Sequence, residues 1–369
     1  MLKRKLAKAS LCNLFIGDAL SMPVHWYYRP GDILGQFGPM GIQEMHAAPE
    51  RHPSSIMNLH STKAGGRRAV EGQSATSEVV GDVILKGKRD LWGQDGTHYH
   101  HGMPAGENTL NAWWARELSQ YLIDENEYSL KTWAQRYIDF MTAEPARHPD
   151  TYAESCHRGF FANWASGKDP LKCGAVTHDT PSMGALVTVA PLVIALLNTH
   201  ELAQIKRVCR DHVGLTHPDE SLLKVVDAYV SLLWSLLNLD QKDDNKVPLF
   251  QTAINATGTV NLEKMLQSDR GDAAIVGGRY SLACYISDSW PSVCYLAAKY
   301  HTTPHKALVV NTNLGGENAH RGSVLGTLIG AASGEIPAAF YSQLAHQQEL
   351  DKLIDQFLNR FVAWPKSGM

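Results

Sequence analysis

Apolar residues recur every three or four positions through much of the chain, and this spacing predicts amphipathic α-helices. It runs through 110–123, 222–239, 293–300 and 350–362. A further apolar run over 184–197 is shorter than the ~20 residues that a membrane span needs, and we interpret it as a buried helix. The alternation of apolar and polar positions that makes a half-buried strand is not evident. The pattern therefore predicts an all-α protein.

The segment from about 28 to 106 departs from this pattern. It is rich in Gly, Pro, His and Ser, and only a patch near 77–85 has helical spacing. Loops of this length inside a folded domain are usually functional. Because no linker or shift of composition divides the chain, we expect one mostly helical domain over residues 1–369 with an elaborate loop region.

Composition and charge narrow the class of protein. The 369 residues are 44% hydrophobic and 19% charged with a net charge of -3, and no run of Lys or Arg forms the basic stripe that nucleic-acid binding needs. The six cysteines are scattered as core fillers would be, which favours a reducing cytoplasm. The basic start imitates a signal peptide, but Gly17 and Asp18 interrupt its apolar part, so we expect a first helix, a cytoplasmic protein and no membrane partner.

The predicted first helix carries a carboxylate on its apolar face. Asp18 follows Leu14 and Phe15 at helical spacing, and a buried acid must be hydrogen-bonded, paired or shifted in its pKa. An acid that only ties down backbone amides is the alternative. His25 follows among aromatic residues that can stack on a base or a sugar, or that simply fill the core.

A polar sequence precedes the helix predicted over 110–123. Glu107, Asn108 and Thr109 follow a glycine, so Asn108 or Thr109 can cap the helix while Glu107 lies beside its positive end. Capping explains one of these side chains but not the series. The three histidines in 98–101 suggest zinc, yet no second cluster has a metal-ligand spacing, and we do not expect a zinc site.

Another helix N-terminus is expected where the run 184–197 begins. Thr180 precedes a proline and predicts the cap, and backbone amides at such a terminus favour an anion such as phosphate. His178, Ser182 and Gly184 surround this terminus and are candidate substrate-binding residues. A Ser-His-Asp triad is not expected, because no nucleophile-elbow pattern surrounds Ser182.

Two adjacent glycines near the C-terminal end deliver polar side chains to a helix start. Gly315 and Gly316 permit a tight backbone, and Glu317, Asn318 and His320 follow at once. This terminus and the one at Glu107, if they face each other, form an acidic pocket for a cation and a phosphorylated ligand. Along the same predicted helix, a glycine at every fourth position lets another helix approach closely: Gly322, Gly326 and Gly330.

Several short blocks of Gly, Asp, Glu and Pro lie in a characteristic order along the chain. They are Gly17-Asp-Ala-Leu20, Leu215-Thr-His-Pro-Asp-Glu220, Cys284-Tyr-Ile-Ser-Asp-Ser-Trp-Pro291, Leu314-Gly-Gly-Glu317 and Gly334-Glu-Ile-Pro337. In this order and spacing they resemble the ADP-ribosylglycohydrolase superfamily over most of the chain. The resemblance implies a compact all-α orthogonal bundle that hydrolyses an N- or O-glycosidic bond to ADP-ribose, usually with two magnesium ions.

The chain departs from the family at its site residues. The family's Thr-Asp-Asp-Thr block looks like Gly106-Glu107-Asn108-Thr109, and its Gly-Gly-Asp-x-Asp-Thr block looks like Gly315-Gly316-Glu317-Asn318-Ala319-His320. The acidic residue that usually ends the first block looks replaced by His25. A later Asn-Gly-x-x-Met-Arg block looks replaced by Met183-Gly184-Ala-Leu-Val-Thr188.

These replacements change the metal that the resemblance implies. Two glutamates, an asparagine and an alanine stand for four ligand aspartates, so only half of the carboxylate charge is left to balance two Mg²⁺. We expect one divalent cation, Mg²⁺ or Mn²⁺, or none, with Glu107, Thr109, Glu317 and His320 as candidate ligands. His320 favours a transition ion in that position, or acts as a general base instead.

The leading hypothesis is a hydrolase of the ribosyl N- or O-glycosidic bond in an ADP-ribose-like substrate, small or attached to a protein. Glu107 and Glu317 then stabilise charge at the anomeric carbon, and His320 or His25 moves the proton. The candidate substrate-binding residues are Asp18, Asn108, His178, Ser182, Gly184, Gly315, Gly316 and Asn318. Two alternatives stay open: a non-catalytic ADP-ribose-binding or crystallin-like structural member, and a hydrolase of another N-riboside.

Overall fold

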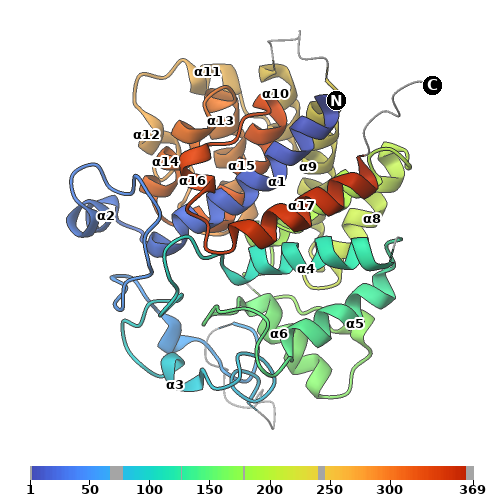
Figure 1. The fold of residues 1–369 in the computed structure, drawn as a ribbon. Helices are drawn as coiled ribbons and strands as arrows, with labels where there is room; N and C mark the ends of the chain where they lie inside the picture. The colour runs from blue at the N-terminus through green and yellow to red at the C-terminus, as the bar shows by residue number, and fades with distance from the viewer. Residues whose placement is uncertain (1, 67–77, 126, 178, 240–245, 363–369) are drawn as a thin grey trace.

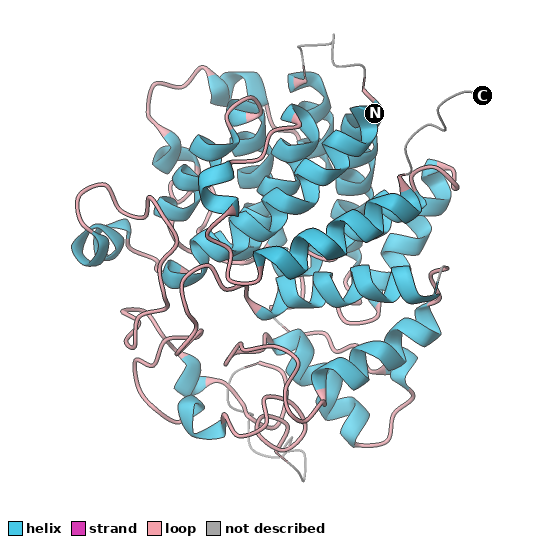
Figure 2. Cartoon of the chain, in the orientation of Figure 1, coloured by secondary structure: helices cyan, strands magenta, loops and turns pink. Residues whose placement is uncertain are grey.

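The computed structural model describes residues 2–66, 78–125, 127–177, 179–239 and 246–362. Within this part the chain forms seventeen α-helices and five 3₁₀ turns, and its only strand-like pairings are isolated bridges (Figure 2). The all-α prediction is confirmed.

The helices follow one another along the chain with loops between them. In order they are α1 (Leu2–Ser21), α2 (Pro30–Phe37), α3 (Arg89–Trp92), α4 (Leu110–Glu125), α5 (Leu130–Met141), α6 (Ser155–Ala165), α7 (Val189–Leu196), α8 (Leu202–Gly214), α9 (Glu220–Asn238), α10 (Val247–Ile254), α11 (Leu262–Leu266), α12 (Asp272–Ile275), α13 (Ile286–Tyr300), α14 (Pro304–Leu314), α15 (Asn318–Ser333), α16 (Ala338–Tyr341) and α17 (Gln347–Phe361). The 3₁₀ turns are η1 (Met22–Val24), η2 (Met57–Leu59), η3 (Pro170–Lys172), η4 (Met183–Leu186) and η5 (Asn255–Thr257).

Apolar spacing located the long helices correctly. The four predicted segments lie in α4, α9, α13 and α17, and the apolar run 184–197 is buried throughout as η4 followed by α7. In the described part of the chain, no helix has the length and apolarity needed to cross a bilayer. All six cysteines are free and five are buried, as expected of core fillers.

Two local predictions were wrong. The helical patch expected near 77–85 forms turns over its described part, 78–85, where Gly81 has a φ of +97° that ends any helix. The helix start expected after Thr180 comes later, because Ser182 is the residue before η4. Long loops do fill the segment between 28 and 106, as predicted, around the short helices α2 and α3.

Helices α1 and α15 pack together at the centre of the molecule, and α17 and α4 lie against them in front (Figure 1). The glycine face of α15 makes this approach possible. A Cβ on Gly326 would lie 2.1 Å from the carbonyl oxygen of Asn13, and one on Gly322 would lie 2.5 Å from that of Gly17. The predicted close helix contact is confirmed.

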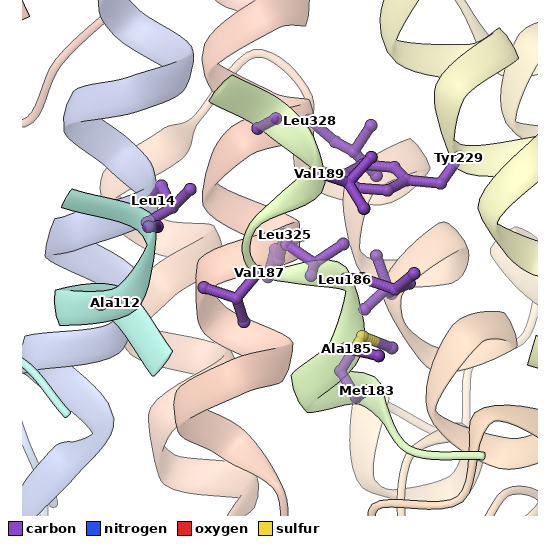
Figure 3. Packing of buried hydrophobic residues seen from close by; sticks show 14 of the residues in the cluster. Leu14, Ala112, Met183, Ala185, Leu186, Val187, Val189, Tyr229, Leu325 and Leu328 are labelled. Carbon is purple, nitrogen blue, oxygen red and sulfur yellow. The ribbon is translucent and has the colours of Figure 1, made fainter. Parts of the chain in front are cut away.

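Buried apolar side chains from α1, α4, α7, α9 and α15 interlock around this contact. Figure 3 shows members of each, among them Leu14, Ala112, Val189, Tyr229 and Leu325. Such close packing holds the helices in fixed relative positions. It therefore also fixes the starts of α4 and α15, where the polar residues singled out above lie. That residues 1–369 form a single domain stays a prediction.

Candidate active site

The starts of α4, α6 and α15 meet beside the loop that follows η1. Glu154 is the residue before α6, Glu317 is the residue before α15, and Thr109 precedes α4. Asn111 in the first turn of α4 donates a hydrogen bond of 2.7 Å to Glu154. The Nδ1 atom of His320 lies 3.9 Å from Glu154 Oε1. Three helix N-termini thus share one group of buried polar side chains.

Gly315 and Gly316 create the turn that places Glu317. Their φ angles are +73° and +64°, in the left-handed region that favours glycine. The N–H of Gly316 donates to Tyr27 O at 2.7 Å, and the N–H of Trp26 donates back to Gly316 O at 2.7 Å. The predicted tight backbone is present, and it ties the start of α15 to the loop after η1.

Trp26 adopts a backbone conformation that is costly for a bulky residue. Its φ is +63°, and strain of this kind persists where the surrounding structure holds a functional side chain in place. The indole N–H donates a short hydrogen bond to Glu317, and the ring stacks on His25 with centroids 3.7 Å apart. Trp26 therefore holds Glu317 in place from the loop that follows η1.

Glu317 and His320 form a buried ion pair within the first turn of α15. The Nδ1 atom of His320 donates a short hydrogen bond to Glu317 Oε1, and both side chains are almost inaccessible. Burial by itself disfavours the imidazolium, but the carboxylates of Glu317 and Glu154 outweigh it and raise the pKa of His320 to about 9. Burial likewise opposes ionisation of Glu317, yet His320 and His25 lower the pKa of this carboxyl far below its usual range. At neutral pH the pair is charged.

Glu154 has the opposite electrostatic environment. Burial raises its pKa, repulsion from Glu317 adds to this effect, and attraction to His320 opposes it. Space for its carboxylate exists because residue 184 is a glycine: a Cβ on Gly184 would lie 2.3 Å from Glu154 Oε2. Two neighbouring carboxyls therefore have pKa values pushed apart, a pattern that separates the acid and base roles in enzymes.

A chain of hydrogen-bonded side chains supports this group from behind. Asp150 accepts a hydrogen bond of 2.8 Å from His100 Nδ1, and His100 Nε2 is joined to His25 Nδ1 at 2.8 Å. The other nitrogen of His25, Nε2, faces Glu317 Oε2 at 3.5 Å. Burial lowers the pKa of His25 to about 3, which the charge of Glu317 offsets only in part. His25 is therefore neutral at physiological pH and acts as a support rather than as an acid.

Two cavities adjoin the side chains around the ion pair. The inner one, of about 10 Å³, is close to the room that one water needs, and Thr109, Asn111, Glu154 and His320 are among its walls. The outer one, of about 120 Å³, is lined mainly by aromatic rings. Trp26, Tyr152 and Glu154 line both cavities. Glu154 thus lies where a water-sized space meets a larger chamber.

The sequence model of the ADP-ribosylglycohydrolase family matches residues 2–366. This chain belongs to the ADP-ribosylglycohydrolase family. A solved structure described as an "ADP-ribosylglycohydrolase-related protein complex" is similar to it, with 17% identity and a TM-score of 0.58 over 97% of this chain and 99% of that chain. At this identity the likeness supports the fold alone. No curated protein matches the chain significantly.

Within this glycohydrolase fold, Glu107 lies apart from Glu317. Its carboxylate accepts hydrogen bonds from His346 Nε2 at 3.0 Å, Trp113 Nε1 at 3.0 Å and the backbone N–H of Asn108 at 2.9 Å. It lines neither cavity. The structure does not bring together the two glutamates that the sequence interpretation paired. Glu154, which that interpretation missed, is the carboxylate that lies beside His320.

Asp18 is buried on the apolar face of α1, as predicted, and its carboxylate is fully used. It accepts hydrogen bonds from Thr109 N at 2.7 Å, Thr109 Oγ1 at 2.6 Å and Asn108 Nδ2 at 2.9 Å. Burial raises the pKa of Asp18 against these hydrogen bonds. The amide nitrogen of Asn318 donates to Thr312 O at 2.9 Å and Val24 O at 3.2 Å, while its Oδ1 atom has no partner among the described residues. Both residues hold the framework of the site together.

Ser182 and His178 are two further candidate substrate-binding residues. Ser182 is buried, and its neighbour Met183 donates its N–H to Cys284 O at 2.9 Å, which joins η4 to the loop before α13. His178 lies outside the described residues. The substrate-binding role predicted for these residues stays a prediction.

The oxygen atoms at this site do not fit the pair of magnesium ions that the family resemblance implies. Both oxygens of Glu317 accept hydrogen bonds, from Trp26 and His320, and those of Asp18 and Glu107 are engaged as described above. A carboxylate that accepts hydrogen bonds can still bind a metal, but two Mg²⁺ ions need several oxygen ligands and more carboxylate charge than Glu317 supplies beside two histidines. His25, Glu317 and His320 do place three ligand atoms within 4.8 Å of one another. Such a set suits a single transition ion, which would have to displace the proton between His320 and Glu317.

Sequence reasoning missed four residues that build the site: Trp26, His100, Asp150 and Glu154. His100 and Trp26 lay in stretches that had been noticed, the histidine cluster and the aromatic run, but they were interpreted as exposed loop and core. Asp150 and Glu154 gave no local signal, because both lie in an ordinary polar segment just before α6.

Proposed function

We propose that this protein hydrolyses a ribosyl N- or O-glycosidic bond in an ADP-ribosyl-type substrate, with Glu154 and His320 as the catalytic residues. Family membership supports a hydrolase of the glycosidase type. The observation that carries the assignment is the contact of 3.9 Å between Glu154 and the His320–Glu317 ion pair at the wall of a water-sized cavity.

The two side chains have complementary protonation states for this reaction. Glu154, with its raised pKa, is suited to take a proton from a water molecule in the inner cavity. His320, held as imidazolium by Glu317, is suited to give a proton to the leaving atom as the bond to the anomeric carbon breaks. The water oxygen then forms the new bond to that carbon. The carboxylate of Glu154 stabilises the positive charge that develops on the ribose, and Glu317 acts through His320 by holding its proton.

The remaining residues position this pair. Trp26 and His25 fix Glu317, and Asp150 and His100 fix His25. No step of the proposed reaction passes through a metal ion.

Turnover of ADP-ribosylated substrates by matched glutamine variants tests the proposal. Glu154→Gln removes the base and should lower kcat by roughly 10²–10⁴-fold, the range typical for a general acid or base. Glu107→Gln is the matched control and should keep near-normal turnover, because Glu107 lies apart from the cavities. Loss of turnover in Glu107→Gln but not in Glu154→Gln would overturn the proposal and favour the glutamate chosen from the sequence. Calorimetry that detects ADP-ribose binding in a protein without turnover would instead favour a non-catalytic member.

A further inference from the structure

The outer cavity has walls made largely of aromatic side chains. Its lining includes five tyrosine or tryptophan rings and one histidine: Trp26, Tyr28, Tyr99, Tyr152, Tyr285 and His60. They come from five separate parts of the chain, so no single helix or loop accounts for their convergence. Aromatic faces carry partial negative charge and attract cations.

Three of these rings form a corner. Trp26, Tyr99 and Tyr152 have centroids 4.6 to 5.1 Å apart, with interplanar angles of 71° to 79°. Hydrogen bonds hold the two phenols in place, since Tyr99 Oη accepts from Ile56 N at 2.9 Å and Tyr152 Oη is joined to His60 Nδ1 at 3.0 Å. The corner is therefore built before any ligand arrives, with faces turned in nearly perpendicular directions.

The charged residues of this cavity have one sign. Glu154 and Asp179 line it, and none of the described lining residues is a lysine or an arginine. The guanidinium of Arg158 is buried, donates to the carbonyl oxygens of Ser61 at 2.6 Å and Gly66 at 3.0 Å, and attracts Asp179 without lining the cavity itself. Among the described lining residues, a phosphate would meet two carboxylates and neither a lysine nor an arginine.

Aromatic side chains also flank the entrance. Tyr28 and Tyr285 are 44% and 37% exposed, which is high for rings of this size, and they lie on loops far apart in the sequence. Exposed apolar surface of this kind around a cavity marks a binding site more often than chance.

We propose that the outer cavity binds an organic cation with few N–H donors, such as an N-alkylpyridinium or quaternary ammonium group of the substrate. Aromatic faces and two carboxylates stabilise such a group, while the phenol oxygens of Tyr99 and Tyr152 are already engaged and offer little to a donor-rich ligand. The proposal concerns the class of ligand that the outer cavity binds. It rests on the proposed function only for the reaction that follows binding.

Equilibrium binding of small probes tests this directly, without turnover. Choline and its neutral isostere 3,3-dimethylbutan-1-ol have the same shape, as do 1-methylnicotinamide and nicotinamide to within a methyl group. We expect each cation to bind at least about tenfold more tightly than its neutral partner. Equal affinities within both pairs would overturn the proposal. Tighter binding of N-ethylguanidinium than of either cation would overturn its donor-poor part.

Variants at the entrance and wall locate the binding. Tyr28→Leu should weaken binding of the cations by roughly two- to fivefold through loss of one exposed ring, whereas Tyr28→Phe keeps the ring and should bind normally. Asp179→Asn, with folding checked by thermal unfolding, should reduce the preference for cation over neutral isostere. If all three variants bind as the parent does, the cation site lies elsewhere. If the protein hydrolyses its substrate but shows no preference for cations, only this inference is wrong. If it binds cations but hydrolyses nothing, only the proposed function is wrong.

Discussion

Glu154 Oε1 lies 3.9 Å from His320 Nδ1, although the two residues belong to the starts of different helices, α6 and α15. Both side chains line a cavity with room for about one water. These two side chains are the base and the acid of the reaction proposed above.

The pH dependence of turnover follows from the two pKa shifts. Activity needs Glu154 deprotonated and His320 protonated, so kcat/KM should fall on the acid side at a pH above the usual 4.5 of a glutamate and on the alkaline side near 9. Glu317→Gln removes the main charge that holds the proton on His320 and should move the alkaline limb to lower pH. An alkaline limb that stays in place in this variant contradicts the assignment of His320.

The same ion pair makes the free energy of unfolding depend on pH. His320 has a folded pKa of about 9 against 6.5 for the unfolded chain, so its stabilisation is complete below pH 6.5 and is lost as the pH rises through about 9. Glu317 has a lowered folded pKa, so its contribution is present above its unfolded pKa and is lost as the pH falls.

Urea unfolding of His320→Gln beside the parent measures this effect. The variant should be less stable by ~3–5 kcal/mol at pH 6, the usual cost of leaving a buried charge unpaired, and the difference should shrink toward pH 9.5. His200→Gln, at an exposed position, should show no such trend. A difference that stays constant with pH would mean that His320 is neutral in the folded protein.

Gly184 gives Glu154 its space, and a single methyl group should disturb it. In Gly184→Ala the new Cβ would meet Glu154 Oε2 at 2.3 Å and Asn111 Nδ2 at 2.7 Å, so the carboxylate must move. We expect a loss of roughly 10²-fold in kcat from misplacement of the base, with a stability cost of ~1–3 kcal/mol. Gly214→Ala, where a Cβ meets nothing within 4 Å, should leave kcat unchanged. Full activity in Gly184→Ala would show that the position of Glu154 is unimportant.

Chelation should not abolish activity. Because the proposed base and acid are Glu154 and His320 and no metal-bound water takes part, dialysis against EDTA and later addition of Mg²⁺ should leave turnover and thermal unfolding unchanged. Zn²⁺ or Ni²⁺ should inhibit, since these ions compete with the proton for His25 and His320. Inactivation by EDTA with recovery in Mg²⁺ would contradict this view and restore the metal-dependent mechanism that the family resemblance implies.

Local sequence signals predicted the parts of this protein that depend on neighbours along the chain. Apolar periodicity located α4, α9, α13 and α17, since a helix buries one stripe of its surface whatever it packs against. The Gly315–Gly316 pair predicted a turn, because only glycine adopts positive φ angles without strain. Glu317 and His320 could be identified for the same reason: they follow that turn at helical spacing.

Contacts between distant segments could not be predicted in this way. Glu107 and Glu154 both lie near helix starts, and no local pattern favours the second over the first. The choice depends on His346, which binds Glu107 from 239 positions away, and on Gly184, which makes room for Glu154.

The amino-acid sequence by itself determined a helical protein, its family and a polar turn before α15, because these follow from hydrophobic spacing, glycine geometry and the order of short blocks. Tertiary structure alone decided which carboxylate accompanies His320, which histidines are buried as supports, and that aromatic rings from separate loops surround one chamber. Such choices arise from packing among segments that are far apart in the chain, and no local pattern encodes them.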